Sequence, residues 1–311
     1  MSGLPRTAPR VAIFTDEPGW HGRVLKAAFA AAGYAARAVS LKECRLDIDG
    51  GAPAVHIPGF EDDLPCGALV RGVAGGTLEE VVLRLDVLHV LPLLGVPVVN
   101  SGRAIERTVD KAMTSFLLAR AGIPTPRTWV TESAEAAQAI ARRAFAAGAT
   151  LVMKPLFGAQ GDGLVRIASA GDLAAVTPRA GVWYLQEFVD HGEAVYRDWR
   201  VFVVQGRARA AMQRVSTHWI TNRAQGARCV ATPLEPELAR LAVAAAAAVD
   251  IDYAGVDLLR DGAGRWLVGE VNGIPAWQGL QRVAAVDLAP LLASALIARI
   301  GTAAGPRCRE A

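Results

Sequence analysis

The sequence has few cysteines and no cysteine pair of the kind that builds metal or disulfide sites. Cys44, Cys66, Cys229 and Cys308 lie far apart in the 311 residues, and no CxxC motif occurs. This spacing speaks against both a zinc knuckle and a disulfide framework, and it indicates reduced thiols. Beyond His21, the histidines also lack metal-ligand spacing.

Long hydrophobic runs and a strong net charge are missing as well. No window of 18 apolar residues occurs, and residues 1–10 contain no long apolar core, so we expect neither a membrane span nor a secretory signal. A net charge of +3 is too small to indicate a nucleic-acid partner. With 52% hydrophobic and 20% charged residues, the composition predicts a globular, cytoplasmic enzyme with two or three cores.

Residues 253–272 are predicted to form a hairpin with three oxygen ligands on one face. Strands at 253–259 and 266–272 flank a glycine-rich turn, so Asp257 and Glu270 fall nearly opposite each other, with Asn272 on the same side. Facing carboxylates repel unless a cation lies between them. Oxygen ligands suit Mg²⁺ or Mn²⁺, which fill their shells with waters and phosphates. The pattern predicts a metal site beside a nucleoside triphosphate; a solvated hairpin with scattered acids is the alternative.

Residues 151–167 are predicted to form a strand, a glycine-rich loop and a second strand. Glycines let backbone amides approach phosphate oxygens, and Lys154 leaves the first strand as a point charge for them. The loop lacks the Gly-Lys-Ser/Thr ending of a Walker motif, and no helix follows it as in a dinucleotide fingerprint. It is either a lid over phosphates or a plain hairpin turn.

Three further segments have both a structural and a functional interpretation. Lys111 begins a helix over 110–121 and is either a phosphate ligand or a solvated lysine. Residues 183–190 read as a buried strand that runs into a connection where an adenine could bond to the backbone, or as an ordinary core strand. In a hairpin over 196–214, Arg214 lies roughly across from Asp198, so its arginines bind a ligand or form internal ion pairs.

In this order, the segments resemble the ATP-grasp superfamily, and within it the RimK-like α-L-glutamate ligases, over roughly residues 96 to 300. The matching segments are 110–111, 154–163, 186–189, 198–204, 210–214, 221–226, 254–257 and 270–272. The resemblance implies an α/β (α+β ATP-grasp) fold in which a parallel-sheet pre-ATP-grasp domain precedes a two-subdomain module.

The resemblance also implies a set of site residues. ATP would contact Lys111, Lys154, Gly158, Gln160, Gly161, Gly163, Gln186, Glu187, Phe188, Val189, Asp198 and Asn222. Mg²⁺ or Mn²⁺ would be held by Asp257, Glu270 and Asn272, with two ions when ATP is bound. Arg214 is our candidate for the transferring phosphoryl group, and Arg200 for a substrate carboxylate.

One departure from the family pattern points to a branch. The chain reads Asn272-Gly-Ile-Pro-Ala where Asn-x-Ser-Pro-Gly is common. With Trp219 and the segment Asn222-Arg-Ala-Gln-Gly226, it is more similar to ligases that add glutamate to tetrahydromethanopterin. That branch implies an acylphosphate, then an amide with L-glutamate, with release of ADP and phosphate. Alternatives are a methanofuran-type or peptide acceptor, a small-molecule kinase, and a nucleotide sensor, which would not need the metal carboxylates. We expect small-molecule substrates, a homo-oligomer (dimer or tetramer), and no nucleic-acid or membrane partner.

Before these segments, alternating strands and helices predict a parallel sheet with ligands at the strand ends. His21, Arg71, Asn100 and Ser101 lie near such ends and could line an acceptor pocket, although surface positions are the alternative for His21 and Arg71. Residues 42–66 are interpreted as a loop-rich insertion. The predicted boundaries are 1–104 for this domain, 105–184 for a lid subdomain, 185–300 for a metal-bearing subdomain and 301–311 for a flexible tail.

Overall fold

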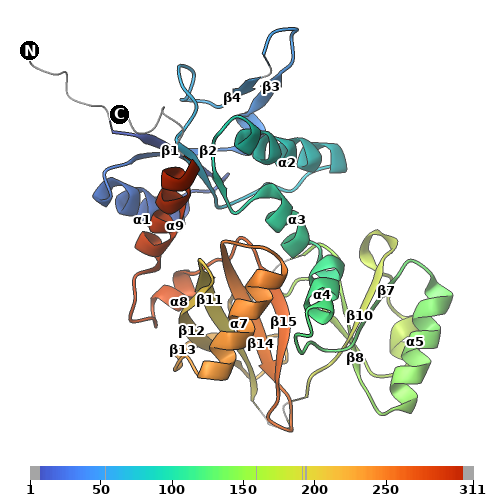
Figure 1. The fold of residues 1–311 in the computed structure, drawn as a ribbon. Coiled ribbons are helices and arrows are strands. Elements are labelled where there is room, and N and C mark those ends of the chain that lie inside the picture. The colour runs from blue at the N-terminus through green and yellow to red at the C-terminus, as the bar shows by residue number, and fades with distance from the viewer. Residues whose placement is uncertain (1–7, 53, 159, 191, 193–194, 304–311) are drawn as a thin grey trace, which may run out of the picture. The chain divides into compact units, whose positions relative to one another are not determined.

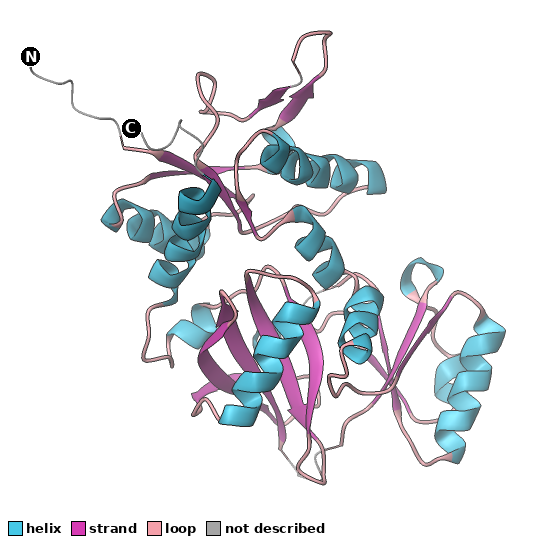
Figure 2. Cartoon of the chain, in the orientation of Figure 1, coloured by secondary structure: helices cyan, strands magenta, loops and turns pink. Residues whose placement is uncertain are grey.

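The computed structural model describes residues 8–52, 54–158, 160–190, 192 and 195–303, and the chain divides into two compact units (Figures 1 and 2). Unit 1 comprises Met1–Ile105, Ile251–Tyr253 and Val286–Ala311, and unit 2 comprises Glu106–Asp250 and Ala254–Ala285. In the described residues, no helix combines the length and the apolar character needed to cross a membrane.

Unit 1 is built on the predicted parallel sheet. Its strands β1 (Arg10–Phe14), β2 (Ala35–Val39), β5 (Gly67–Val70) and β6 (Val98–Val99) lie in the order β2-β1-β5-β6 and pair in parallel. Its helices are α1 (Gly19–Ala31), α2 (Leu78–Leu93) and α9 (Leu288–Ala303), and α3 (Gly102–Val109) leads into unit 2. The buried run Val11 to Phe14 has no polar face, as expected for a parallel strand covered on both sides.

Two boundaries in unit 1 differ from the predicted ones. Helix α9 packs on α1 and β5, so the end of the chain groups with the N-terminal sheet and not with the metal-bearing subdomain. The predicted tail starts inside this helix, which runs to Ala303, and residues 304–311 lie outside the described residues. The insertion at 42–66 contains a short hairpin, β3 (Arg45–Asp47) and β4 (Ala54–His56). With three residues each, these strands are too short to be recognised from an alternation of apolar and polar residues.

Unit 2 contains two sheets, the first of which corresponds to the predicted lid subdomain. The order is β7-β10-β8-β9, with antiparallel pairing between neighbours. The strands are β7 (Thr128–Thr131), β8 (Leu151–Lys154), β9 (Val165–Ile167) and β10 (Trp183–Glu187). Helices α5 (Ala134–Ala146) and α6 (Ala170–Ala174) pack on them. The predicted boundary at 184 falls inside β10, so this sheet extends to Glu187.

The second sheet of unit 2 has five strands in the order β13-β12-β11-β14-β15. They are β11 (Tyr196–Val204), β12 (Arg207–Ser216), β13 (Arg228–Ala231), β14 (Tyr253–Arg260) and β15 (Trp266–Asn272). Helices α4 (Lys111–Arg120), α7 (Pro236–Ala248) and α8 (Gln278–Gln281) accompany them, with the short turn η3 (Arg223–Gln225), whereas the turn η2 (Arg179–Gly181) precedes β10 of the first sheet.

The register of this sheet agrees with the sequence pattern. Asp257 pairs with Glu270, and Asp198 pairs with Arg214. The turn between β11 and β12 places Gln205 and Gly206 at φ 50° and 65°, the left-handed conformations that a two-residue hairpin loop requires. The predicted fold class, a mixed α/β chain with one parallel and several antiparallel sheets, is confirmed.

Candidate functional site

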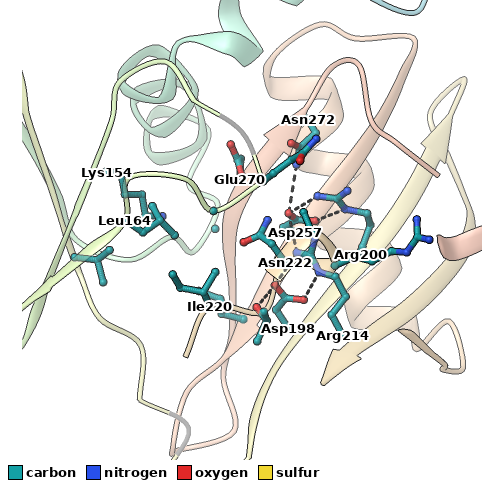
Figure 3. A pocket seen from close by; sticks show the side chains of 18 of the residues that line it. Lys154, Leu164, Asp198, Arg200, Arg214, Ile220, Asn222, Asp257, Glu270 and Asn272 are labelled. Carbon is teal, nitrogen blue, oxygen red and sulfur yellow. Dashed lines mark hydrogen bonds and ion pairs between the residues drawn. The ribbon is translucent and has the colours of Figure 1, made fainter. Parts of the chain in front are cut away.

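A single cavity in unit 2 collects the predicted site residues. Its volume is about 630 Å³, within the usual range for small-molecule sites. Every predicted ATP, metal and catalytic residue except Gly163 lines it. Figure 3 labels some of them, namely Lys154, Asp198, Arg200, Arg214, Asn222, Asp257, Glu270 and Asn272. Gly163 has φ +71°, and a Cβ there would lie 2.8 Å from Pro155 Cγ, so this glycine shapes the loop and does not face the cavity.

Lys111 connects the glycine-rich loop with strand β15. Asp110 caps α4 by accepting hydrogen bonds from the backbone nitrogens of Ala112 and Met113 at 2.8 and 3.1 Å. The cap fixes the first turn and directs Lys111 Nζ to Gly158 O at 2.7 Å, with Glu270 Oε1 at 3.7 Å. The lysine charge is therefore next to the predicted metal ligand.

Lys154 is held by the side chain of Gln186. Lys154 Nζ donates to Gln186 Oε1 at 2.6 Å, and the Gln186 amide nitrogen donates to Thr128 Oγ1 at 2.9 Å and to the Tyr184 hydroxyl at 3.2 Å. Gln186, the first residue of the predicted adenine-binding segment 186–189 (the hinge), thus orients a lysine with its side chain. Burial lowers the pKa of Lys154, and Lys111 adds to this effect against the opposing charges of Glu270 and Asp257.

A first testable expectation concerns Lys154. Its charged form is the one that binds phosphate, and its lowered pKa means that the charge is lost at a lower pH than the ordinary 10.5. We expect kcat/KM for ATP to fall on the alkaline side before that value, and Lys154→Arg to move the fall to higher pH. Lys154→Ala should cost about 2 to 4 kcal/mol of transition-state stabilisation. An alkaline limb that is identical in wild type and Lys154→Arg contradicts the assignment.

The glycine-rich loop lies directly against the segment that carries Asn222. Gly161 has φ +77°, and a Cβ there would come 2.7 Å from both Asn222 Oδ1 and Ile220 Cγ2. Only glycine satisfies both the backbone and the space. Figure 3 shows Leu164 and Ile220 on the Lys154 side of the cavity, where they form an apolar wall that the sequence pattern did not indicate because single aliphatic residues carry no signal.

Asp257 is bound by two arginines. Arg200 donates from Nε and Nη2 to its two oxygens at 2.6 Å each, and Arg214 Nη2 lies 2.9 Å from Oδ2. Burial alone would raise the pKa of Asp257, but the charges and hydrogen bonds of Arg200 and Arg214 outweigh it and hold the pKa at about 2. The carboxylate is therefore ionised at neutral pH.

Asp198 has its oxygens occupied in the same network. Arg214 donates to both at 2.6 Å, and Thr221 Oγ1 donates to Oδ2 at 2.6 Å. Asp198 and Arg214 are 6% and 3% exposed, so removing either side chain would leave the other as a buried charge without this partner. Arg200 and Arg214 thus form the internal ion pairs that the sequence left open, and their contacts with a substrate stay predictions. Asp198 accepts from Arg214 and Thr221 and also lines the cavity, and its role as a nucleotide-binding acid stays a prediction.

Asp257, Glu270 and Asn272 fit a divalent cation by their donor chemistry. Across the described ranges no three His, Cys, Asp or Glu side chains gather to hold a metal, so the set is two facing carboxylates and an amide. The Asn272 amide nitrogen donates to Gly255 O and Asp257 Oδ2 at 3.2 and 3.3 Å, which leaves the amide oxygen to bind a cation. Among the described residues, Asp257 Oδ1 accepts from Arg200 alone, so a lone pair remains there. An oxygen set of this kind suits Mg²⁺.

An aromatic cluster surrounds the predicted hinge. The Phe188 ring meets Tyr196 and Trp219 edge to face at 6.4 and 6.0 Å, and the Arg166 guanidinium stacks on it at 4.2 Å. Tyr196 and Trp219 line the cavity and were not predicted as site residues. The sequence did not predict their contact with Phe188, because only the fold brings the three rings together.

The predicted acceptor residues His21, Arg71, Asn100 and Ser101 belong to unit 1. Asn100 Nδ2 donates to Tyr253 O at 2.8 Å, and its Oδ1 accepts from the backbone nitrogens of Asp252 and Tyr253 at 3.1 and 2.9 Å. Ser101 Oγ accepts from Ala104 N at 3.2 Å. Asn100 thus joins two segments of unit 1, and Ser101 bonds to the first turn of α3, while acceptor contacts for all four residues stay predictions.

Comparison with known proteins gives a consistent set of relatives. A family model described as a RimK-like ATP-grasp domain matches residues 108–296. The tetrahydromethanopterin:alpha-L-glutamate ligase of Methanococcus maripaludis is 40% identical over 233 residues, which cover 73% of this chain and 77% of the relative. A protein of the same name from Methanocaldococcus jannaschii is 33% identical over 246 residues, 76% of this chain and 81% of that one.

Solved structures show the same fold at lower identity. The ATP-grasp ligase PsnB, in a complex with minimal precursor, Mg and ADP, superposes with a TM-score of 0.72 at 22% identity over 94% of this chain and 98% of that chain. D-alanyl-alanine synthetase A from Vibrio cholerae has a TM-score of 0.67 at 12% identity, with 96% and 100% covered. These structures confirm the predicted fold, and the family match and the relatives confirm the predicted enzyme class.

Proposed function

Since this chain belongs to the RimK-like family of ATP-grasp ligases, we propose that it adds L-glutamate to a carboxylate-bearing cofactor of the tetrahydromethanopterin type. The reaction would pass through an acylphosphate and release ADP and phosphate. The relatives named for this activity, at 40% and 33% identity over about three quarters of the chain, support the acceptor class. The chemistry is supported by one observation: Lys111 and Lys154 line the same cavity as Asp257 and Glu270, whose carboxylates are paired in the strand register.

Phosphoryl transfer depends mainly on positioning and charge neutralisation. Lys111 and Lys154 would bind the nucleotide phosphates, with Gly158, Gln160 and Gly161 over them. The backbone from Glu187 to Val189 would bind the adenine. Arg214 is fixed by Asp198 through Nε and Nη2, which leaves Nη1 for the transferring phosphoryl group at no further ordering cost.

Asp257, Glu270 and Asn272 would hold Mg²⁺, which supplies charge neutralisation on the phosphates, with a second ion when ATP is bound. Arg200, paired through Nε and Nη2 with Asp257, would align the acceptor carboxylate beside this face. The cytoplasmic location and the homo-oligomeric state stay predictions.

The acylphosphate route gives a second testable expectation. ADP should form in step with the amide, and hydroxylamine should replace glutamate and trap the activated acceptor as a hydroxamate, because an acylphosphate reacts with any good amine. The nucleotide product can be identified by anion-exchange chromatography. AMP as the product would overturn the mechanism.

The acceptor is tested by mass spectrometry after incubation with ATP, Mg²⁺, L-glutamate and a panel of pterin cofactors, furan cofactors and peptides. We expect a pterin product heavier by one glutamyl unit. A glutamylated furan or peptide with an unchanged pterin would reject the acceptor and keep the ligase chemistry.

A further inference from the structure

Arg223 lies at the β13 edge of the five-stranded sheet, whereas Lys111 and Glu270 lie at the β15 edge. Strands β15 and β13 are the two outer strands of this sheet, and Glu270 beside Lys111 marks the β15 edge. Arg223 precedes β13 in the turn η3 and also lines the cavity. At about 4.8 Å per strand step, four steps separate the two edges by roughly 19 Å.

The guanidinium of Arg223 differs from those of Arg200 and Arg214, which carry fixed ion pairs with Asp257 and Asp198. In the residues that the structure describes, the Arg223 side chain makes no hydrogen bond and no ion pair. Its carbonyl accepts from Gly226 N at 3.0 Å, so the turn is ordered, and the side chain is exposed, so its charge faces solvent until an anion binds. An arginine of this kind inside a substrate cavity is available to an anion.

A glycine provides the space that Arg223 occupies. Gly279, in α8, is buried, and a Cβ there would lie 3.1 Å from Arg223 Cδ and 3.0 Å from Cys229 Sγ. The backbone of Gly279 is not left-handed, so the fold does not require glycine at this position for its φ angle. The requirement comes from the Cys229 sulfur and the Arg223 stem, which both pack on it.

We propose that Arg223 binds the side-chain carboxylate of the amine substrate and thereby selects L-glutamate over analogues with a neutral side chain. This inference rests on the proposed function. In the proposed function the nucleotide phosphates lie at Lys111 beside Glu270, and the transferring phosphoryl group lies at Arg214 on β12. Arg223 is next beyond Arg214 in the strand order, so it is placed for the amine that attacks there. A guanidinium recognises a carboxylate through two parallel hydrogen bonds and loses most of this interaction when the carboxylate becomes an amide.

The experiment measures steady-state ADP release with ATP, Mg²⁺ and a saturating pterin acceptor, with L-glutamate, L-glutamine or hydroxylamine as the amine. Arg223→Gln is expected to raise the KM for L-glutamate by about 10- to 100-fold, the effect of one charge-assisted pair. Its preference for glutamate over glutamine should disappear. The hydroxylamine rate should stay within about twofold, because hydroxylamine has no carboxylate to lose; Arg223→Lys should lie between the two.

Two further variants separate a specific contact from a general disturbance. Arg228→Gln removes an exposed arginine from β13 that does not line the cavity, and its kinetics should match wild type. Gly279→Ala places a methyl group in the space of the Arg223 stem and should raise the KM for glutamate in the same direction. Combined with Arg223→Gln, it should add little, because both changes act on one contact.

The outcomes are distinguishable. If wild type forms no glutamyl product, the proposed function fails and this inference with it. If wild type is active and Arg223→Gln keeps its KM for glutamate within twofold, only the inference is overturned. The inference is also overturned if Arg223→Gln loses as much activity with hydroxylamine as with glutamate, or if its KM rises for the acceptor and not for glutamate. Arg223 would then act in the activation of the acceptor.

Discussion

Glu270→Gln is expected to remove most Mg²⁺-dependent ADP release and to leave thermal unfolding close to that of wild type. The substitution keeps the size of the side chain and deletes one negative metal ligand. Glu270 is about 30% exposed, and its ion pair with Lys111 is long, at 3.7 Å, so the pair contributes about 1 kcal/mol or less to stability. The loss of turnover should be hundredfold or more, on the order of a single preorganised charge in a catalytic site.

The measurements are initial rates over a Mg²⁺ titration and a melting curve of the same preparation. Glu237→Gln serves as the control, because this residue lies in the first turn of α7 and outside the cavity. Near-normal turnover of Glu270→Gln at low millimolar Mg²⁺ would contradict the assignment of Glu270 as a metal ligand. Asp257→Asn is a weaker test, since it also disturbs Arg200 and Arg214.

Arg214→Leu is expected to abolish the activation step and to destabilise unit 2 strongly. It leaves the buried carboxylates of Asp198 and Asp257 without one of their shared partners. Breaking a buried ion pair from one side costs about 3 to 5 kcal/mol. At roughly 2 to 4 °C per kcal/mol for a domain of this size, the melting midpoint should fall by about 10 °C.

The double variant Arg214→Leu/Asp198→Leu distinguishes the role in stability from the role in catalysis. Removing both charges leaves no unpaired ion between these positions, so much of the lost stability should return. Activity should not return, because the group that faces the phosphoryl oxygens is still missing. Recovery of ADP release in the double variant would show that Arg214 acts only through folding.

The local pattern of the sequence was enough to predict the elements that carry the site. Alternation and turn chemistry predicted the β14–β15 and β11–β12 hairpins, and a period of two along each strand then fixed which side chains face each other. For this reason the amino-acid sequence alone predicts the opposition of Asp257 to Glu270, and of Asp198 to Arg214. The order of the segments indicated the family.

Only the tertiary structure decided which partner each charge has. Arg200 and Asp257 lie on different hairpins, and a hairpin register says nothing about the neighbouring strand, so their pairing at 2.6 Å was not predictable. The same holds for Lys154 with Gln186 and for the packing of Arg223 on Gly279. Helix α9 joins the N-terminal sheet although it is last in the chain, because burial of an apolar face depends on shape in three dimensions and not on sequence distance.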